Sequence, residues 1–164
     1  MSVEYFNANY LDAGAAVKLV LEERGSDNLK TYFNNRAGLI TNLCLAEALG
    51  VLKRKMLKGQ LSEKHYLDSC YHLLTYVRAN RIQIEDIPIS SLDVFAKVED
   101  IVRRHKLDFS DSLQLVSVKH GRFSKLARSS KTLLITADRD LASAAKTEGL
   151  RVWNCEVEAA PPLS

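Results

Sequence analysis

The chain has 164 residues, of which 46% are hydrophobic and 26% charged, and its formal net charge is +3. This composition is ordinary for one globular domain with a buried core, and it excludes a strongly basic chain. No apolar run is long enough to span a bilayer, and the first residues lack the basic start and apolar core of a signal peptide. We therefore expect a cytoplasmic protein that makes no membrane contact.

The cysteines and histidines form no recognisable metal or disulfide pattern. The three cysteines, Cys44, Cys70 and Cys155, are far apart and include no C-x-x-C pair, which fits reduced thiols. The four histidines lack the spacing of zinc ligands. The pattern thus argues against a disulfide scaffold and against a zinc site.

Short apolar runs alternate with helical patterns along the chain, which favours a parallel sheet built from β–α–β units. The runs that read as strands are residues 10–11, 38–40, 82–84, 133–135 and 150–153. No linker divides the sequence. We expect one domain over residues 1–155, followed by a flexible C-terminal tail over residues 156–164.

Helices are expected between these strands, with starts marked by capping residues. The first runs from about residue 13 to 23 and closes at Gly25. The later ones are capped by Thr41 or Asn42, Ser62, Ser90 or Ser91, Asp108 or Ser110, and residues 136–138. The helices on either side of residue 60 predict an antiparallel hairpin that protrudes from the sheet. In the helix after Ser91, we expect Phe95, Val98 and Val102 to face inward.

Four acidic residues stand in or near the segments where an apolar strand-like run gives way to a helix: Asp12, Glu47, Asp111 and Asp138. In an open parallel sheet, such positions converge at the crevice beyond the carboxyl ends of the strands. A pair of like charges ~5 Å apart costs roughly 3 kcal/mol at an effective dielectric of 20. Such a cluster persists by holding protons or divalent cations, and oxygen ligands favour Mg²⁺ or Mn²⁺. Taken singly, each residue could be only a helix cap, as Asp111 and Asp138 in first helical turns illustrate. Asp12 at a buried strand end and the mid-helix Glu47 are harder to explain in this way.

Four segments resemble the PIN-domain family, and within it the VapC-type toxins of toxin–antitoxin pairs. They are YLDAGAAVKL, LITNLCLAEALGVLKRK, DFSDSLQLVSVKHG and LLITADRDLASAAKTEGLRVWN, in the order and rough spacing of that family. The TADRDLA stretch is the most specific of them. The resemblance implies an α/β fold, a three-layer α/β/α sandwich with a central, roughly five-stranded parallel sheet.

The same resemblance implies a Mg²⁺- or Mn²⁺-dependent endoribonuclease in which Asp12, Glu47, Asp111 and Asp138 bind metal and perform catalysis. Asp140 and Thr136 are possible accessory residues, although Thr136 also fits a helix cap. The chain departs from many relatives at Gly14, where they carry Ser, Thr or Asn, and so it lacks one polar group near the metal.

Two basic stretches flank the acidic positions and suggest where RNA lies. One is Lys53, Arg54, Lys55 and Lys58, and the other is Lys119, Arg122, Lys125, Arg128 and Lys131. Arg54, Arg122, Lys125 and Arg128 are the candidates for RNA binding. For each of them, a solvated helix face or loop is the alternative explanation.

The resemblance further implies a homodimer and a cognate antitoxin protein, and the helix from Ser62 to Asn80 is a candidate surface for either. Two other functions remain open. One is a catalytically silent PIN-like module that binds RNA or acts as a scaffold. The other is a phosphotransfer domain, which lacks support because no Asp-x-Asp follows the first strand and no late strand ends in lysine.

Overall fold

A five-stranded parallel sheet forms the centre of the molecule in the computed structural model, which describes residues 8–121 and 132–162. The strands are β1 (Asn9–Leu11), β2 (Gly38–Ile40), β3 (Ile82–Ile84), β4 (Leu133–Thr136) and β5 (Arg151–Asn154), and they pair in the order β3-β2-β1-β4-β5. Every pairing between neighbours is parallel. All five expected strands are therefore present, each within a residue of its predicted limits.

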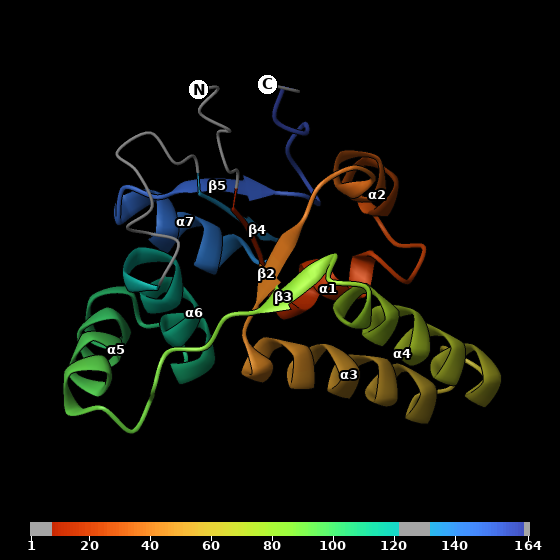
Figure 1. Ribbon diagram of the computed structural model, residues 1–164, viewed down its shortest axis with the longest axis horizontal. Coiled ribbons are helices and arrows are strands. Elements are labelled where there is room, and N and C mark those ends of the chain that lie inside the picture. Colours follow the sequence, from red (N-terminus) through yellow and green to blue (C-terminus); the bar gives the residue numbers. More distant parts are fainter. Residues whose placement is uncertain (1–7, 122–131, 163–164) are drawn as a thin grey trace.

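Seven helices in the described residues cover the two faces of this sheet (Figure 1). They are α1 (Ala13–Lys18), α2 (Ser26–Phe33), α3 (Asn42–Leu57), α4 (Glu63–Arg78), α5 (Leu92–His105), α6 (Phe109–His120) and α7 (Arg139–Thr147). Leu11 and Ile135 pack in one core with α1 to α4, while Tyr10 and Leu134 pack in a second core with α5 to α7. Since successive strand residues point to opposite faces, the apolar strands supply both cores. The three-layer α/β/α architecture is confirmed.

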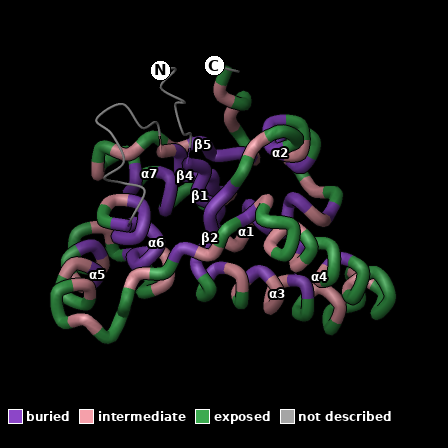
Figure 2. The backbone as a smooth tube through the Cα atoms, in the orientation of Figure 1, coloured by how far each residue is buried: buried purple, intermediate pink, exposed green. Residues whose placement is uncertain are grey.

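Helices α3 and α4 form the antiparallel hairpin that the sequence predicts. The Thr41 side chain accepts a hydrogen bond from the Cys44 backbone N–H at 3.0 Å, and Ser62 caps α4 in the same way through His65. Near the sheet, Leu52 and Leu73 are fully buried. The far end of the hairpin is exposed, as the tube coloured by burial shows (Figure 2). Within the described residues, no helix is both long and apolar enough to cross a membrane.

The prediction of one helix from residue 13 to 23 was wrong, because α1 ends at Lys18 and a further helix, α2, begins at Ser26. Gly25 does not close a helix but precedes one, with a φ of 85°. A Cβ atom at Gly25 would lie 2.2 Å from the carbonyl oxygen of Cys155, so the close approach of two backbones requires glycine there. Helix α2 then buries Leu29 and Phe33 in the core.

The expected inward face of α5 was partly wrong. Val98 and Ile101 are buried, but Phe95 is 47% exposed and contacts the ring of Phe109, with 6.4 Å between the ring centroids. The inner stripe of α5 thus runs through Val94, Val98 and Ile101, which follows the 3.6-residue helical repeat.

Contacts with the domain extend past residue 155, where the tail was expected to begin. Glu156 lies 3.2 Å from the Lys18 ammonium, and Glu158 lies 2.5 Å from that of Lys146. The backbone carbonyl of Glu158 also accepts a hydrogen bond from the Trp153 indole. The ordered contacts therefore reach Glu158.

Gly38 lies so close to a buried ring that we expect Gly38→Ala to destabilise the fold. A Cβ atom there would lie 2.6 Å from Cζ of Phe33, and overpacking of this kind costs about 1–3 kcal/mol. Gly50→Ala is the matched control, since its Cβ would meet only Arg54 at 3.6 Å and alanine favours the helix by about 0.5–1 kcal/mol. Urea denaturation measures both. A Gly38→Ala variant as stable as the parent would contradict the packing of β2 against α2.

Candidate functional site

The order of the strands places a crevice at the carboxyl ends of β1 and β4. The chain builds outward from β1 through β2 to β3 and then returns to add β4 on the other side of β1. This reversal is the topological switch point, the usual ligand site of an open parallel sheet. Asp12 follows β1 directly, and Asp138 lies two residues beyond β4.

Both of these aspartates also cap the helices that leave the crevice. Asp12 Oδ1 accepts a hydrogen bond from the Ala15 backbone N–H at 2.6 Å, at the start of α1. Asp138 Oδ1 accepts from the backbone N–H groups of Asp140 and Leu141 at 2.7 and 2.9 Å, at the start of α7. Capping engages one oxygen of Asp138 and leaves Oδ2 for a ligand.

The other two acidic residues reach the same place from helices. Glu47 lies on α3, and Asp111 lies in the first turn of α6, whose cap is Asp108. Together with Asp12 and Asp138 they line one cavity of about 290 Å³, whose remaining lining residues are Ala13, Gly14, Cys44 and Ala137. We call this the acidic cavity. All four acidic residues expected from the sequence thus lie around it.

Burial and mutual repulsion make two of these carboxyl groups, those of Asp12 and Asp111, hard to ionise. Burial raises the pKa of Asp12 to about 6, the hydrogen bonds from Thr136 and Ala15 oppose this rise, and the charge of Asp138 adds to it. Burial also raises the pKa of Asp111 to about 7, and the charges of Asp108, Asp138, Asp12 and Glu47 raise it further. The acidic cavity therefore favours protons or a cation over an unoccupied cluster of charges.

Thr136 connects the two aspartates at the strand ends. This residue is fully buried at the end of β4, and its hydroxyl donates to Asp12 Oδ2 and accepts from the Asp138 backbone N–H at 2.9 Å. The side chain of Asp140, by contrast, lines a separate cavity with His105 and Lys106. Of the two accessory residues expected from the sequence, only Thr136 contacts the acidic set through its side chain.

Two residues near the acidic cavity were missed as functional candidates. The Ser110 hydroxyl donates to Glu47 Oε1 at 2.6 Å, and Asp108 Oδ1 lies 3.2 Å from the same hydroxyl. Cys44 lines the cavity, its thiol lies 3.1 Å from Gln114 Oε1, and burial raises its pKa to about 12. A mid-helix glutamate beside apolar residues needs a donor, and this need was the available signal for Ser110.

The described basic residues are only partly available for RNA. Lys55 pairs with Glu23 at 2.6 Å, Lys119 pairs with Glu148 at 2.5 Å, and Lys53 lies over the Tyr66 ring. Arg54 is exposed on α3, two helical turns beyond Glu47. Arg122, Lys125, Arg128 and Lys131 lie outside the described residues.

The four carboxylates share a cavity, yet in the described part of the chain no three acidic, histidine or cysteine side chains are grouped closely enough to hold a metal ion. Donors already engage some of the carboxylate oxygens, since Thr136 and Ala15 donate to Asp12 and Ser110 donates to Glu47. The donor set still suits a hard cation, since it consists of carboxylate oxygens in one cavity.

An acidic cavity at the switch point of a five-stranded parallel sheet places the chain among the open α/β domains whose ligand site lies at the carboxyl ends of the strands. The model of the PIN domain family matches residues 10–147, and the chain belongs to this family. PIN domains are typically nucleases, which supports a hydrolase that acts on nucleic acid. The match leaves the phosphotransfer alternative without support.

One solved structure shows the same fold. The crystal structure of PAE2754 from Pyrobaculum aerophilum is similar with a TM-score of 0.58 and 20% sequence identity, over 89% of each chain. At this level of identity, the likeness concerns the fold alone. A search of the curated proteins found no match.

The raised pKa of Asp111 predicts how stability depends on pH in metal-free buffer. Between pH 3.8, the ordinary pKa, and about pH 7, the folded state keeps a proton that the unfolded state has lost. Stability therefore falls as the pH rises through this window. We expect Asp111→Asn to flatten the fall and to unfold later than the parent at pH 8; Asp12 keeps part of the fall, and Glu148, with its lowered pKa, contributes a rise at the acid end of the range.

Urea denaturation between pH 4 and pH 8 measures this dependence. Asp68→Asn is the matched control, because Asp68 is an exposed residue of α4 that pairs with Lys64 and does not line the acidic cavity among the described residues. That variant is expected to keep the parental slope. An Asp111→Asn variant with the same slope as the parent would contradict the repulsion in the acidic cavity.

Proposed function

We propose that this PIN domain is a Mg²⁺- or Mn²⁺-dependent endoribonuclease and the toxin of a toxin–antitoxin pair. One observation carries the proposal, namely that carboxylates from β1, α3, α6 and the end of β4 line a single cavity. The raised pKa values of Asp12 and Asp111 support it, because a divalent cation would release the stored repulsion. We infer RNA as the substrate, and the role as a toxin, from the resemblance to VapC-type toxins.

In this mechanism, Asp12 and Asp111 hold the cation with the help of Asp138 and Glu47. A divalent ion bound there supplies an activated water and offsets the charge of the attacked phosphate. The Thr136 hydroxyl fixes the position of Asp12 relative to the start of α7, because it hydrogen-bonds both Asp12 and the Asp138 backbone N–H. The Ser110 hydroxyl orients Glu47. Such outer partners set the geometry of metal ligands.

The basic residues assist from the edge of the site. Arg54 extends from α3 beyond Glu47, and its guanidinium passes near Gly50, where the absent Cβ would lie 3.6 Å from Nη1. We assign Arg54, together with Arg122, Lys125 and Arg128, to contacts with the RNA backbone.

The protruding hairpin is the proposed surface for a second copy or for the antitoxin. Leu67 and Tyr71 lie one helical turn apart on α4 and are 42% and 69% exposed, and Leu57 at the end of α3 is 72% exposed. These three exposed apolar side chains support an interaction surface on the hairpin.

The second candidate function is an RNA-binding or scaffold module without turnover. The observation that favours it is the lack of a ready metal cluster in the described residues. Gly14 adds to this, since a Cβ there would lie 3.6 Å from Asp12 Oδ1, in a position from which a hydroxyl could reach the cation. Metal-dependent cleavage distinguishes the two functions.

The decisive test is cleavage of labelled single-stranded and structured RNAs with Mg²⁺, with Mn²⁺ and with chelator. We expect Asp12→Asn to lower the rate at least about 100-fold, because it removes a cation ligand, while the protein stays folded. Asp68→Asn makes the same chemical change on the exposed face of α4 and is expected to keep parental activity. Cleavage by Asp12→Asn at the parental rate would refute the proposed site.

Ser110 provides a test that does not depend on turnover. We expect Ser110→Ala to weaken Mn²⁺ binding about tenfold, because Glu47 loses its donor, while the melting temperature in chelator barely changes. Ser110→Thr keeps the hydroxyl and is expected to restore the affinity. Isothermal titration measures both variants, and equal Mn²⁺ affinities for Ser110→Ala and the parent would show that Ser110 does not position Glu47.

A further inference from the structure

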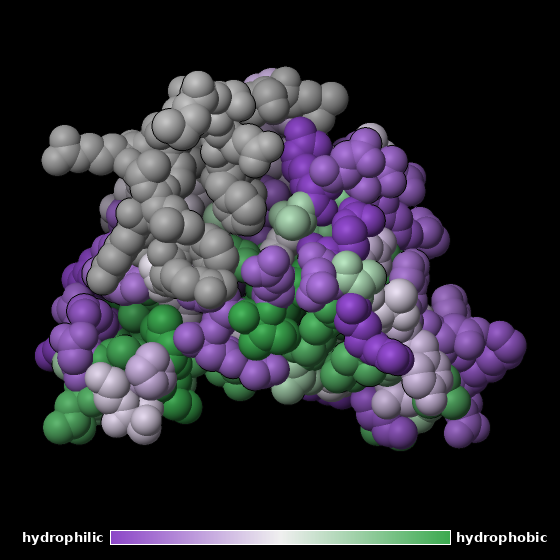
Figure 3. All heavy atoms as spheres, viewed as in Figure 1, coloured by the Kyte–Doolittle hydropathy of each residue, from purple (hydrophilic) through white to green (hydrophobic). Residues whose placement is uncertain are grey.

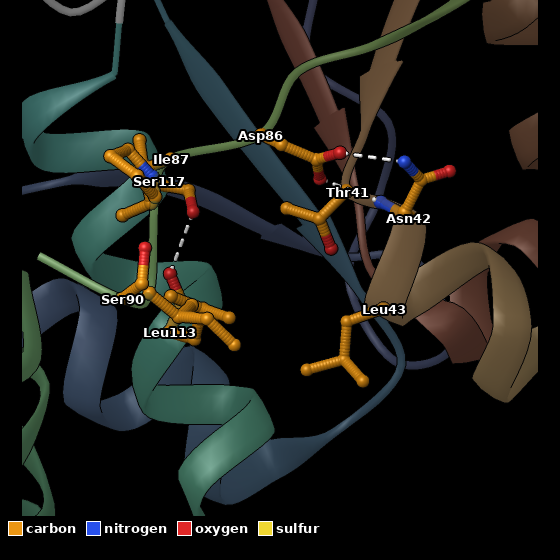
Figure 4. A pocket seen from close by; sticks show the side chains of 10 residues that line it. Thr41, Asn42, Leu43, Asp86, Ile87, Ser90, Leu113 and Ser117 are labelled. Atoms are coloured by element: carbon orange, nitrogen blue, oxygen red, sulfur yellow. Dashed lines mark hydrogen bonds between the residues drawn. The ribbon is translucent and has the colours of Figure 1, made fainter.

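A second cavity, of about 380 Å³, lies between the start of α3 and α6 (Figure 4). Three segments enclose it: the start of α3, the chain after β3 over residues 86–90, and the face of α6 that carries Leu113 and Ser117. Leu43, Ile87 and Leu113 provide apolar walls, and Asp86 and Asn42 lie together at one edge. In the space-filling view, apolar side chains gather over the middle of this face and over α5 (Figure 3).

The two cavities share two walls. On α3, Leu43 lines the second cavity and the next residue, Cys44, lines the acidic cavity. On α6, Leu113 lines the second cavity and Asp111 the acidic cavity; they lie about 3 Å apart along the axis but point to different sides of the helix. The two cavities therefore open on either side of the start of α6, so that an RNA strand crossing this helix start could place a phosphate at one and a base in the other.

The lining chemistry disfavours a phosphate as the occupant, because the ten lining residues in the described part of the chain include no lysine, arginine or histidine. The charge of Asp86 is already engaged, since it accepts hydrogen bonds from the Asn42 backbone N–H at 2.9 Å and from Asn42 Nδ2 at 2.7 Å. These bonds hold the Asn42 amide, whose Oδ1 and second N–H form an acceptor and donor pair suited to the edge of a nucleobase.

We propose that this second cavity binds one unpaired nucleobase of the RNA strand whose phosphate lies at the acidic cavity. The proposal rests on the proposed function and adds the element that selects the cleavage position. Unpaired bases are recognised by apolar contact with their faces and by hydrogen bonds to their edges, which Leu43, Leu113 and Asn42 offer here. A base in a duplex is stacked and paired and does not reach such a site.

The size of the cavity favours a base over a protein partner. Its volume lies at the lower end of the range for small-ligand sites, about 300–1,000 Å³. A protein partner needs about 800 Å² of surface on each side of an interface, far more than one such cavity offers. One flat heterocycle next to the scissile phosphate fits both the volume and the position.

Ser90→Tyr tests the proposal, because Ser90 is an exposed lining residue and tyrosine there narrows the cavity without filling the core. Ser143→Tyr, at an exposed serine of α7 outside both cavities, is the matched control. The probes are single-stranded RNA oligonucleotides, each lacking the base at one position. Binding is measured with both substitutions placed on Asp12→Asn, so that no probe is cleaved, and the cleavage position is mapped with the active chain.

We expect one position at which loss of the base weakens binding about tenfold, near the lower end of the effect of a base stacked on an aromatic ring, because the described lining is apolar but not aromatic. Ser90→Tyr should weaken binding of the intact RNA by a similar factor and abolish the sensitivity to that base, whereas Ser143→Tyr should change neither. The sensitive position should lie next to the cleaved bond.

Unchanged binding and base sensitivity in Ser90→Tyr would overturn the proposal. So would a change of molecular mass in sedimentation caused by Ser90→Tyr, since the surface would then belong to a second copy of the chain. The same experiments test the proposed nuclease separately. Base-sensitive binding without metal-dependent cleavage would support the base-binding cavity and refute the nuclease. Metal-dependent cleavage that is the same for every abasic position would support the nuclease and refute the base-binding cavity.

Discussion

Electrostatic repulsion among carboxylates at the carboxyl ends of β1 and β4 is the constraint on which the rest of the site depends. Four acidic side chains share one cavity, and burial raises the pKa of two of them into the range of about 6 to 7. Each is tolerated because a donor holds it or a helix begins beside it. The N-terminus of a helix carries roughly half a positive charge, so the starts of α6 and α7 offset part of the negative charge.

Capping and function are therefore not competing explanations for these residues. Asp12 and Asp138 cap α1 and α7 with one oxygen each, and the same residues face the acidic cavity. The helix start supplies N–H groups to the carboxylate, and the carboxylate caps the helix that leaves the sheet. Loss of either side chain would act on the fold and on the site together, whereas asparagine keeps an oxygen that can cap the helix.

A buried ion cluster holds the helices in place on the side of α6 and α7 that lies away from the acidic cavity. The side chain of Glu148, at the end of α7, is only 4% exposed and contacts Lys119 on α6 and both Arg104 and His105 on α5. Burial opposes its charge, but hydrogen bonds from Lys119, His105 and Arg104 outweigh this and lower its pKa to about 2. Since α6 carries Asp111 and α7 begins at Asp138, this cluster links two of the elements that form the acidic cavity.

The amino-acid sequence by itself determined the five strands, the cap at Ser62, the helix starts near residues 41 and 108, and the four acidic residues, because each depends on a local pattern of apolar and capping residues. Only the tertiary structure decided the rest. Gly25 begins α2 instead of ending α1, since it must pass close to the backbone of Cys155, and Ser110 serves Glu47 across 63 positions of sequence. Such contacts depend on the distance between elements after packing, and no local pattern encodes that distance.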